Sequence, residues 1–197
     1  TGTFTMSGGT INVQTISAGT PTSFILGSGT TFNMSGGTIV LVNGDNATWD
    51  MDVRSGTQNI SGGTVQIGSG ATTAANNFAI ANGGGGTLRL WNLTHAAGVA
   101  RSNTLGSAVN VLNSLTIQAN NTLIGGGFAI NVGDATGNAI PGIGNWTNNG
   151  AYTTGTSTVS FVGPGAATLG GSVATTFQNL TINKAAAEDF VFVDPPY

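Results

Sequence analysis

Charged residues are the scarcest feature of this sequence. Only 11 of its 197 residues are charged, 4 Lys or Arg and 7 Asp or Glu, whereas charged residues make up about a quarter of an average globular domain. Nucleic-acid binding depends on clustered Lys and Arg side chains that contact phosphates. The four cations are instead scattered through the chain, at Arg54, Arg89, Arg101 and Lys184. The sequence therefore predicts no nucleic-acid partner.

Cysteine is absent altogether, which excludes a disulfide framework, a thiolate metal site and a cysteine nucleophile. Long apolar runs are missing as well. A transmembrane helix needs about 18 or more consecutive apolar residues, and the longest apolar stretches here, such as residues 39–42, have the length of strands. We expect a soluble chain that does not insert into a membrane.

Small residues dominate what is present: the chain has 33 Gly, 30 Thr and 21 Asn. Hydrophobic residues still make up 39% of it, the mean hydropathy is +0.18 and the net charge is only -3. Disordered chains combine low hydrophobicity with high net charge, so this composition predicts a folded protein. A collagen helix is excluded because Gly does not recur at every third position.

A repeat of about 25 residues organises the first half of the chain. Three copies share the sequence Ser-Gly-Gly-Thr, and a fourth, decayed copy follows; they cover residues 4–13, 32–41, 58–67 and 84–90. The threonine after the glycine pair recurs at Thr10, Thr38, Thr64 and Thr87. The four threonines are therefore expected to lie in one column.

Each copy predicts a strand, a tight turn and a second strand. Apolar residues alternate with polar ones on either side of the glycine pair, as in half-buried strands. The interval of five from Met6 to Ile11 would place them on opposite faces of one straight strand, so the chain must bend between them. A glycine pair can adopt the positive φ or the bulge that this corner requires.

A repeat this short cannot bury its own apolar side chains, but coils stacked on one another build a continuous core. The sequence therefore predicts an all-β fold, a right-handed parallel β-helix or β-solenoid with about 25 residues per coil. The expected internal columns are Phe4, Phe32 and Phe78; Met6, Met34 and Ile60; and Ile11, Ile39, Val65 and Leu88.

We interpret residues 1–197 as a single solenoid segment, with regular repeats over 1–90 and looser coils over 91–197. Residues 92–108 look less strand-like and are expected to form a protruding loop or an irregular coil, and the glycine-rich stretch 133–144 a second excursion. Because the sequence starts at Thr1 without an initiator methionine, we expect an excised piece of a longer chain or a mature product.

The second half resembles repeats of very large secreted and surface proteins of Bacteroidetes-type bacteria. The resemblance is carried by residues 144–150, 155–161 and 176–183. The Ser-Gly-Gly-Thr copies resemble the β-solenoid repeats of bacterial adhesins and autotransporter passengers. The resemblance implies an extracellular or cell-surface location and a structural or adhesive, filament-forming role. The ends of a solenoid are open sheet edges, which proteins must cap or pair, so we expect neighbouring repeats or subunits to stack on them. Surface glycans are a further expected partner.

The only cluster of acidic residues is Asp45, Asp50 and Asp52. Asp50 and Asp52 point to one side of a strand with Arg54 two residues further on, so a carbohydrate site beside Trp49 and a calcium site are two alternatives. The simpler interpretation, which we prefer, is structural: the aspartates cap turns between coils. We assign no catalytic, cofactor-binding or metal-binding residue and expect no enzyme and no cofactor.

Three further features have simple interpretations. His95 is the only histidine, and we expect it to face solvent in a loop. The pairs Gly68/Gly70 and Gly163/Gly165 lack the rest of a dinucleotide motif and predict turns. The final residues 194–197, Asp-Pro-Pro-Tyr, match the tetrapeptide of amino-group methyltransferases, a coincidence in a chain without the α/β pattern of that family.

The sequence thus predicts a structural or adhesive segment of an extracellular bacterial surface protein. Two alternatives stay open. One is a carbohydrate-binding or carbohydrate-cleaving β-helix module. The other is an ice-binding solenoid, in which rows of threonine on a flat face would order water.

Overall fold

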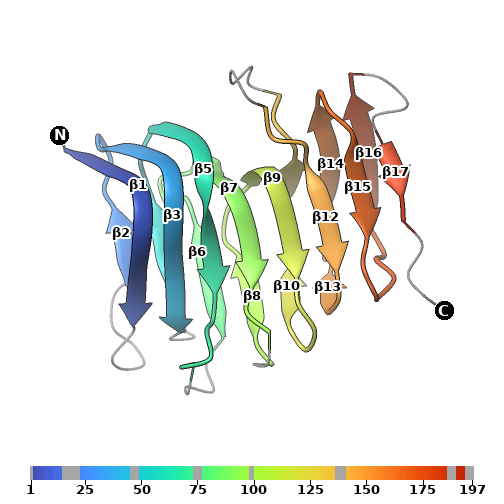
Figure 1. The fold of residues 1–197 in the computed structure, drawn as a ribbon, viewed down its shortest axis with the longest axis horizontal. Coiled ribbons are helices and arrows are strands. Elements are labelled where there is room, and N and C mark those ends of the chain that lie inside the picture. The colour runs from blue at the N-terminus through green and yellow to red at the C-terminus, as the bar shows by residue number, and fades with distance from the viewer. Residues whose placement is uncertain are drawn as a thin grey trace.

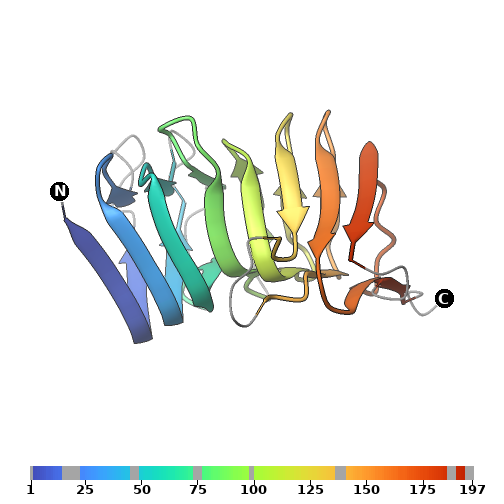
Figure 2. The ribbon, with the colours of Figure 1, turned by 90° about the horizontal axis from the view of Figure 1, so that it is seen from above.

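Parallel strands wind into a β-solenoid of about six turns, with roughly 26 residues per turn, in the computed structural model. Long strands lie side by side from β1 at one end of a rod to β17 at the other (Figure 1), and the same order is seen from above (Figure 2). This confirms the predicted all-β solenoid. The described residues, which contain no helix, are 2–14, 23–44, 49–72, 77–97, 100–135, 141–185 and 190–193.

The strands form two parallel sheets. The 11-stranded sheet contains β1 (Thr3–Gln14), β3 (Thr31–Asn43), β5 (Thr57–Ile67), β7 (Leu88–His95), β9 (Val109–Ile117), β11 (Ala129–Val132), β12 (Asn145–Asn148), β14 (Thr158–Gly163), β15 (Ala167–Gly170), β16 (Asn179–Lys184) and β17 (Phe190–Phe192). The six-stranded sheet contains β2 (Phe24–Leu26), β4 (Met51–Val53), β6 (Phe78–Ala81), β8 (Ser102–Leu105), β10 (Thr122–Ile124) and β13 (Ala151–Thr153).

The larger sheet bends at the corner that the glycine pairs mark, so the solenoid has three faces. Strand register shifts there, between Met6 and Thr10 in β1. Further along, the corner divides separate strands: β11 pairs with the first half of β9, and β12 pairs with its second half. We call the halves before and after this corner the first and second faces, and the six-stranded sheet the third face. We number the coils by the strand that each contributes to the third face. Coils 1 to 6 contain β2, β4, β6, β8, β10 and β13, in that order.

Glycine is required at this corner because successive coils touch there. Gly37 has a φ of 82°, and a Cβ at this position would lie 2.6 Å from the Met6 side chain and 2.8 Å from the backbone of Gly8. Gly9, its equivalent in coil 1, also has a positive φ, of 76°, but has open space around it. The predicted role of the glycine pair is confirmed.

The core consists of side chains stacked in columns between coils. The predicted column of Met6, Met34 and Ile60 is confirmed, and all three are buried. Phe4 lies over Phe32 as predicted, but Phe32 is followed by Gln58, and Phe78 lies in the third face instead. The prediction for Phe78 was therefore wrong.

The fourth copy of the repeat was also misplaced. Thr64 pairs with Asn92 and Val65 with Leu93, so neither Thr87 nor Leu88 continues the predicted columns. The glycine-rich run before Leu88 is not the first-to-second corner. It belongs to a six-residue loop, 82–87, between the third face of coil 3 and the first face of coil 4.

Gln58 compensates for this longer loop with hydrogen bonds from its side chain. Its Nε2 donates to the carbonyl oxygen of Thr87 at 2.8 Å, and its Oε1 accepts from the amide of Arg89 at 2.9 Å. The buried amide thereby satisfies backbone groups of the next coil, as buried polar groups require. A glutamine thus replaces the phenylalanine of the earlier coils.

The second half keeps the same architecture. Of residues 92–108, 92–95 belong to β7 and 102–105 to β8, so this stretch is part of a coil. Of the two predicted alternatives, the protruding loop was therefore wrong. At 133–144 the chain does make an excursion, of which residues 136–140 lie outside the described parts. Gly133 and Gly144 lie against each other at its base, where a Cβ on Gly144 would come within 2.6 Å of the Gly133 Cα.

Amide side chains form ladders on the outside of the solenoid. The Nδ2 of Asn59 donates to Oδ1 of Asn33 at 2.8 Å, and Asn33 donates in turn to the Thr5 hydroxyl at 3.3 Å. Asn131 and Asn110 make the same contact at 2.9 Å in later coils. Uncharged side chains on the surface thus hydrogen-bond to one another along the axis of the solenoid. Such contacts link adjacent coils without charged groups.

We predict that Gly37→Ala destabilises the solenoid much more than Gly9→Ala. Both substitutions place Ala at a positive φ, which costs about 1 kcal/mol, but only Gly37→Ala also overlaps the preceding coil, for a total of about 3 kcal/mol. Urea unfolding followed by circular dichroism measures the difference. Gly27→Ala, at a position with open space and no positive φ, is the control and should change the unfolding midpoint least. Equal effects at Gly9 and Gly37 would contradict the proposed contact between coils.

Candidate functional site

The acidic residues of the sequence cluster lie on or beside strand β4, where Asp50 and Asp52 flank the inward-facing Met51. Both aspartates are buried, with exposures of 1% and 0%. Asp45 lies outside the described residues. The Oδ2 of Asp50 accepts a hydrogen bond from the amide of Ala79 in coil 3 at 2.8 Å. The carboxylate therefore ties one coil to the next.

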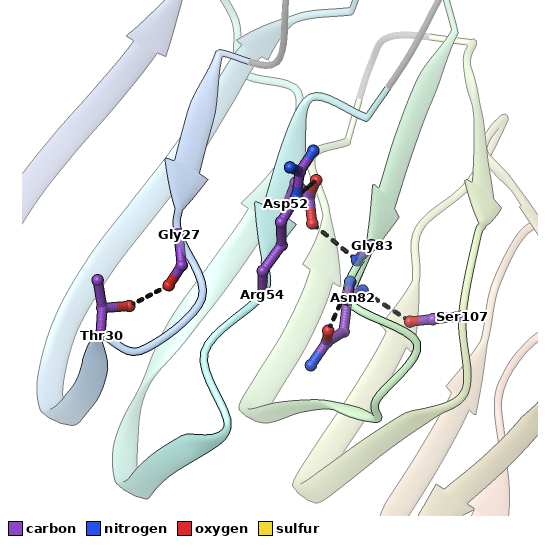
Figure 3. Close-up of polar contacts among 8 residues, drawn as sticks. Gly27, Thr30, Asp52, Arg54, Asn82, Gly83 and Ser107 are labelled. Atoms are coloured by element: carbon purple, nitrogen blue, oxygen red, sulfur yellow. Dashed lines mark hydrogen bonds and ion pairs between the residues drawn. The ribbon is translucent and has the colours of Figure 1, made fainter. Parts of the chain in front are cut away.

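Asp52 makes a similar link and pairs with Arg54 (Figure 3). Its Oδ1 accepts from the Gly83 amide at 2.7 Å, and its Oδ2 lies 2.7 Å from Nε of Arg54. The Arg54 side chain is 45% exposed, so the pair joins a buried carboxylate to a cation at the surface. This arrangement agrees with the predicted structural role of the aspartates, since each carboxylate accepts a backbone amide.

The loop 82–87 is fixed from both sides by this network. The Asn82 amide hydrogen bonds to the Ser107 hydroxyl of coil 4 at 2.8 Å, while the neighbouring Gly83 is bound to Asp52 of coil 2. Within the loop, Oδ1 of Asn82 accepts from the Gly84 amide at 3.1 Å, and its Nδ2 donates to the Thr87 carbonyl oxygen at 3.4 Å. Figure 3 shows the contacts from Asp52 to Gly83 and from Asn82 to Ser107, which link three successive coils.

A groove lies next to this network, where corners of different lengths adjoin. Residues 82–87 form the third-face corner of coil 3, whereas the corner of coil 4 contains only residues 106–108. A hollow of about 460 Å³ lies here. It is lined by the short corner, by the loop of coil 3, by Trp49 and by Phe128 of coil 5.

Trp49 is held in place by contact with a glycine two coils away. A Cβ on Gly106 would overlap the six-membered ring of the Trp49 indole, so the ring lies directly against the backbone of coil 4. Sequence reasoning singled out Trp49 as a neighbour of the aspartates. It missed Gly106 and Phe128, because only the stacking of coils brings residues so far apart in sequence together.

His95 does not face solvent, contrary to the prediction. It is the last residue of β7, is 1% exposed and lies beside Ile67 in a core column. Its Nδ1 lies 3.2 Å from the carbonyl oxygen of Thr116, so Nδ1 carries the proton and donates. No hydrogen-bond partner of Nε2 is found among the described residues. The alternation of Leu93 and His95 in the sequence was the signal for an inward position.

Burial lowers the pKa of His95 from its ordinary value of 6.5 to about 4, and the bond to Thr116 opposes this shift only in part. The cause is the loss of hydration of the charged imidazolium in an apolar interior. The histidine is therefore neutral at pH 7 and acts as a core residue.

Other motifs of the sequence add little chemistry. Gly68, Gly163 and Gly165 have positive φ values, as expected for turns. Within the parts of the chain that the structure describes, no three His, Asp or Glu side chains gather as metal ligands. The terminal residues 194–197 lie outside the described parts.

Comparison of the chain with protein-family models, curated proteins and solved structures found no significant match. None of the segments described here forms a helix that could cross a membrane. The fold and the local geometry therefore carry the functional argument.

We predict that the solenoid loses stability on mild acidification because of His95. The folded-state pKa of about 4 lies below the unfolded value of 6.5, so the unfolded state binds the proton first as the pH falls. The stabilisation is complete above pH 6.5 and is lost towards pH 4, with a loss of about 2 kcal/mol between pH 7 and pH 5.

Urea unfolding of the wild type and of His95→Leu at several pH values measures this effect. The leucine variant fills the same core column without a titratable group, so its stability should change less between pH 7 and pH 5. Identical pH dependence in the two proteins would show that other groups cause it.

We also predict that Asp52→Asn loosens the loop 82–87. The substitution removes the charge that the Gly83 amide and Arg54 both bind, at a cost of about 1–3 kcal/mol for a buried polar group. Amide hydrogen exchange at Gly83 should become faster. Arg54→Met, which removes only the surface partner, is the control and should cost less than about 1 kcal/mol. Unchanged protection of Gly83 in Asp52→Asn would refute the role of the carboxylate.

Proposed function

We propose that this chain is a rod-forming structural and adhesive segment of an extracellular bacterial surface protein, without catalytic activity. The observation that carries the proposal is the stacking of equivalent residues from β1 through β16 and β17, in which each coil is the template for the next. Each turn lengthens such a rod by one strand spacing, about 4.8 Å. A long rod can thus be built from many short repeats.

The last coil supports a role in a longer assembly. Leu180, Ile182 and Phe192 are 40%, 46% and 64% exposed, although they pair with Val159, Phe161 and Leu169 of the preceding turn. These side chains occupy core columns and are exposed only because the described chain places nothing over them.

A hollow of about 330 Å³ at the same end is lined by Leu169, Phe177, Leu180 and Phe192. Its apolar walls suit the next layer of a solenoid, which would continue the columns. We infer that neighbouring repeats or further subunits stack on the ends of the rod. Open sheet edges of this kind otherwise favour uncontrolled pairing with other chains.

The absence of catalytic activity is proposed because Asp50 and Asp52 have structural roles. Asp50 and Asp52 are both buried and both accept backbone amides, whereas glycoside hydrolysis needs a pair of carboxyl groups that reaches the substrate. The extracellular, bacterial-surface part of the proposal depends on the resemblance of residues 144–150, 155–161 and 176–183 to surface-protein repeats.

The ice-binding alternative is less well supported. Thr10, Thr38 and Thr64 do form one column on the second face, but Asn92 follows them. The regular threonine row that would order water therefore ends within the first coils. An adhesive surface built from amides and hydroxyls does not need that regularity.

We predict that the chain self-associates through its ends. Sedimentation velocity over a range of concentrations should show growing end-to-end species, and Phe192→Ser should reduce them because it removes the most exposed apolar side chain of the end. Phe128→Ser is the matched control, since Phe128 is a partly exposed phenylalanine that does not line the hollow at that end. A single monomeric species at every concentration, or an equal loss in the control, would count against stacking at the ends.

A further inference from the structure

We propose that the groove across coil 4 binds a neutral glycan chain. The inference rests on the proposed adhesive function and names the ligand class and the site for it. The residues that would make the contacts are Trp49 and Phe128, together with the exposed part of the loop 82–87.

Two adjacent corners of the solenoid make up most of the lining of the groove. They are the three-residue corner 106–108 and the six-residue loop 82–87. That loop is fixed by hydrogen bonds to both Asp52 and Ser107 (Figure 3). A groove with fixed walls loses little conformational entropy when a ligand binds, and its volume of about 460 Å³ lies in the range of small-ligand sites.

The aromatic side chains are placed to stack against sugar rings. The Trp49 ring is packed against Gly106 of coil 4, and Phe128 lies at the next corner, in coil 5, with 37% of its surface exposed. A pyranose ring has an apolar face of C–H groups and a polar rim of hydroxyls. Aromatic rings supply a large, rigid contact area for such a face.

The polar groups of the groove suit hydroxyl partners. Asn82 and Ser107 are only 5% and 7% exposed, and their side chains hold the loop 82–87 and the corner beside it through internal hydrogen bonds. Ligand hydroxyls would instead meet the exposed backbone of Gly85 and Gly86 and the half-buried Thr87. Stacking together with directional hydrogen bonds is a typical means of ligand recognition in a partly apolar site.

The ligand should be uncharged because no charged side chain lines the described groove. Acidic polysaccharides and nucleic acids need cations for their anionic groups. A peptide would gain most by adding a strand to a free sheet edge, but β8 is already paired with β6 and β10. A neutral glycan is therefore the class that the groove fits best.

The test is a titration of the 197-residue chain with neutral oligosaccharides derived from cellulose, xylan, mannan and chitin, measured by isothermal calorimetry. Oligogalacturonate supplies an acidic comparison, and a casein digest supplies unstructured peptides. We expect at least one neutral oligosaccharide to bind, and Trp49→Ala and Phe128→Ala each to weaken that binding at least tenfold. Phe192→Ala, an exposed phenylalanine outside the groove, should bind as the wild type does.

Trp49 packs on coil 4, so Trp49→Ala affects the structure as well as the ligand surface. Phe128→Ala is included as a second variant for this reason. Each variant is compared with the wild type by circular dichroism. Failure of every neutral oligosaccharide to bind, unchanged binding in Phe128→Ala, or preference for the acidic sugar or the peptides would overturn the proposal. If the chain still self-associates through its ends, only the glycan site is refuted and the proposed structural function is not.

Discussion

Everything in this structure depends on the parallel hydrogen-bonded register between successive coils. Each strand pairs with the strand one turn before it and one turn after it, so similar side chains lie over one another at the spacing of a β-sheet. Like residues then pack on like, as Met6 does on Met34 and Asn33 on Asn59. This register also brings the backbones of successive coils close together at the corner between the first and second faces. Glycine is therefore required there, as at Gly37, where no Cβ fits.

The same register explains where polar groups enter the core. Where the repeat changes length, backbone groups lose their expected partners, and buried side chains replace them. Gln58 bonds to Thr87, the last residue of the loop 82–87, and to Arg89 just beyond it, and Asp52 holds Gly83 within the same loop. Irregularity in the repeat is thus accompanied by buried polar side chains, and the candidate groove lies beside the same irregular corner.

Much of the fold could be predicted from the sequence because its signals are local. The Ser-Gly-Gly-Thr copies indicate the bend, and alternation indicates which side chains face inward, so the column of Met6, Met34 and Ile60 was predicted correctly. Errors came where the repeat changes length. Gly84–Gly86 resemble the corner motif in composition but form another loop, which misplaced Thr87 and Leu88. His95 was misjudged because its chemical type, rather than its alternation with Leu93, was given weight.

The candidate site was less accessible to sequence reasoning for a physical reason. Asp50, Asp52 and Arg54 are near one another in sequence, and their grouping was recognised. Trp49, Gly106 and Phe128 lie in coils 2, 4 and 5, so their proximity depends on the number of residues in each intervening turn. Small errors in turn length shift the alignment of whole coils, and a contact of this kind is then lost.

The touching pair Gly133 and Gly144 has a consequence for how this rod can change over time. An insertion whose two ends meet at a single point leaves the strands on either side in place. Asp134 is buried, and a Cβ on Gly142 would overlap the carbonyl of Leu112, so both ends of the insertion are fixed. Changes of length or composition between these ends would leave the columns inside undisturbed. Such a position is a natural place for evolution, or for a protein engineer, to graft a new binding loop onto an unchanged scaffold.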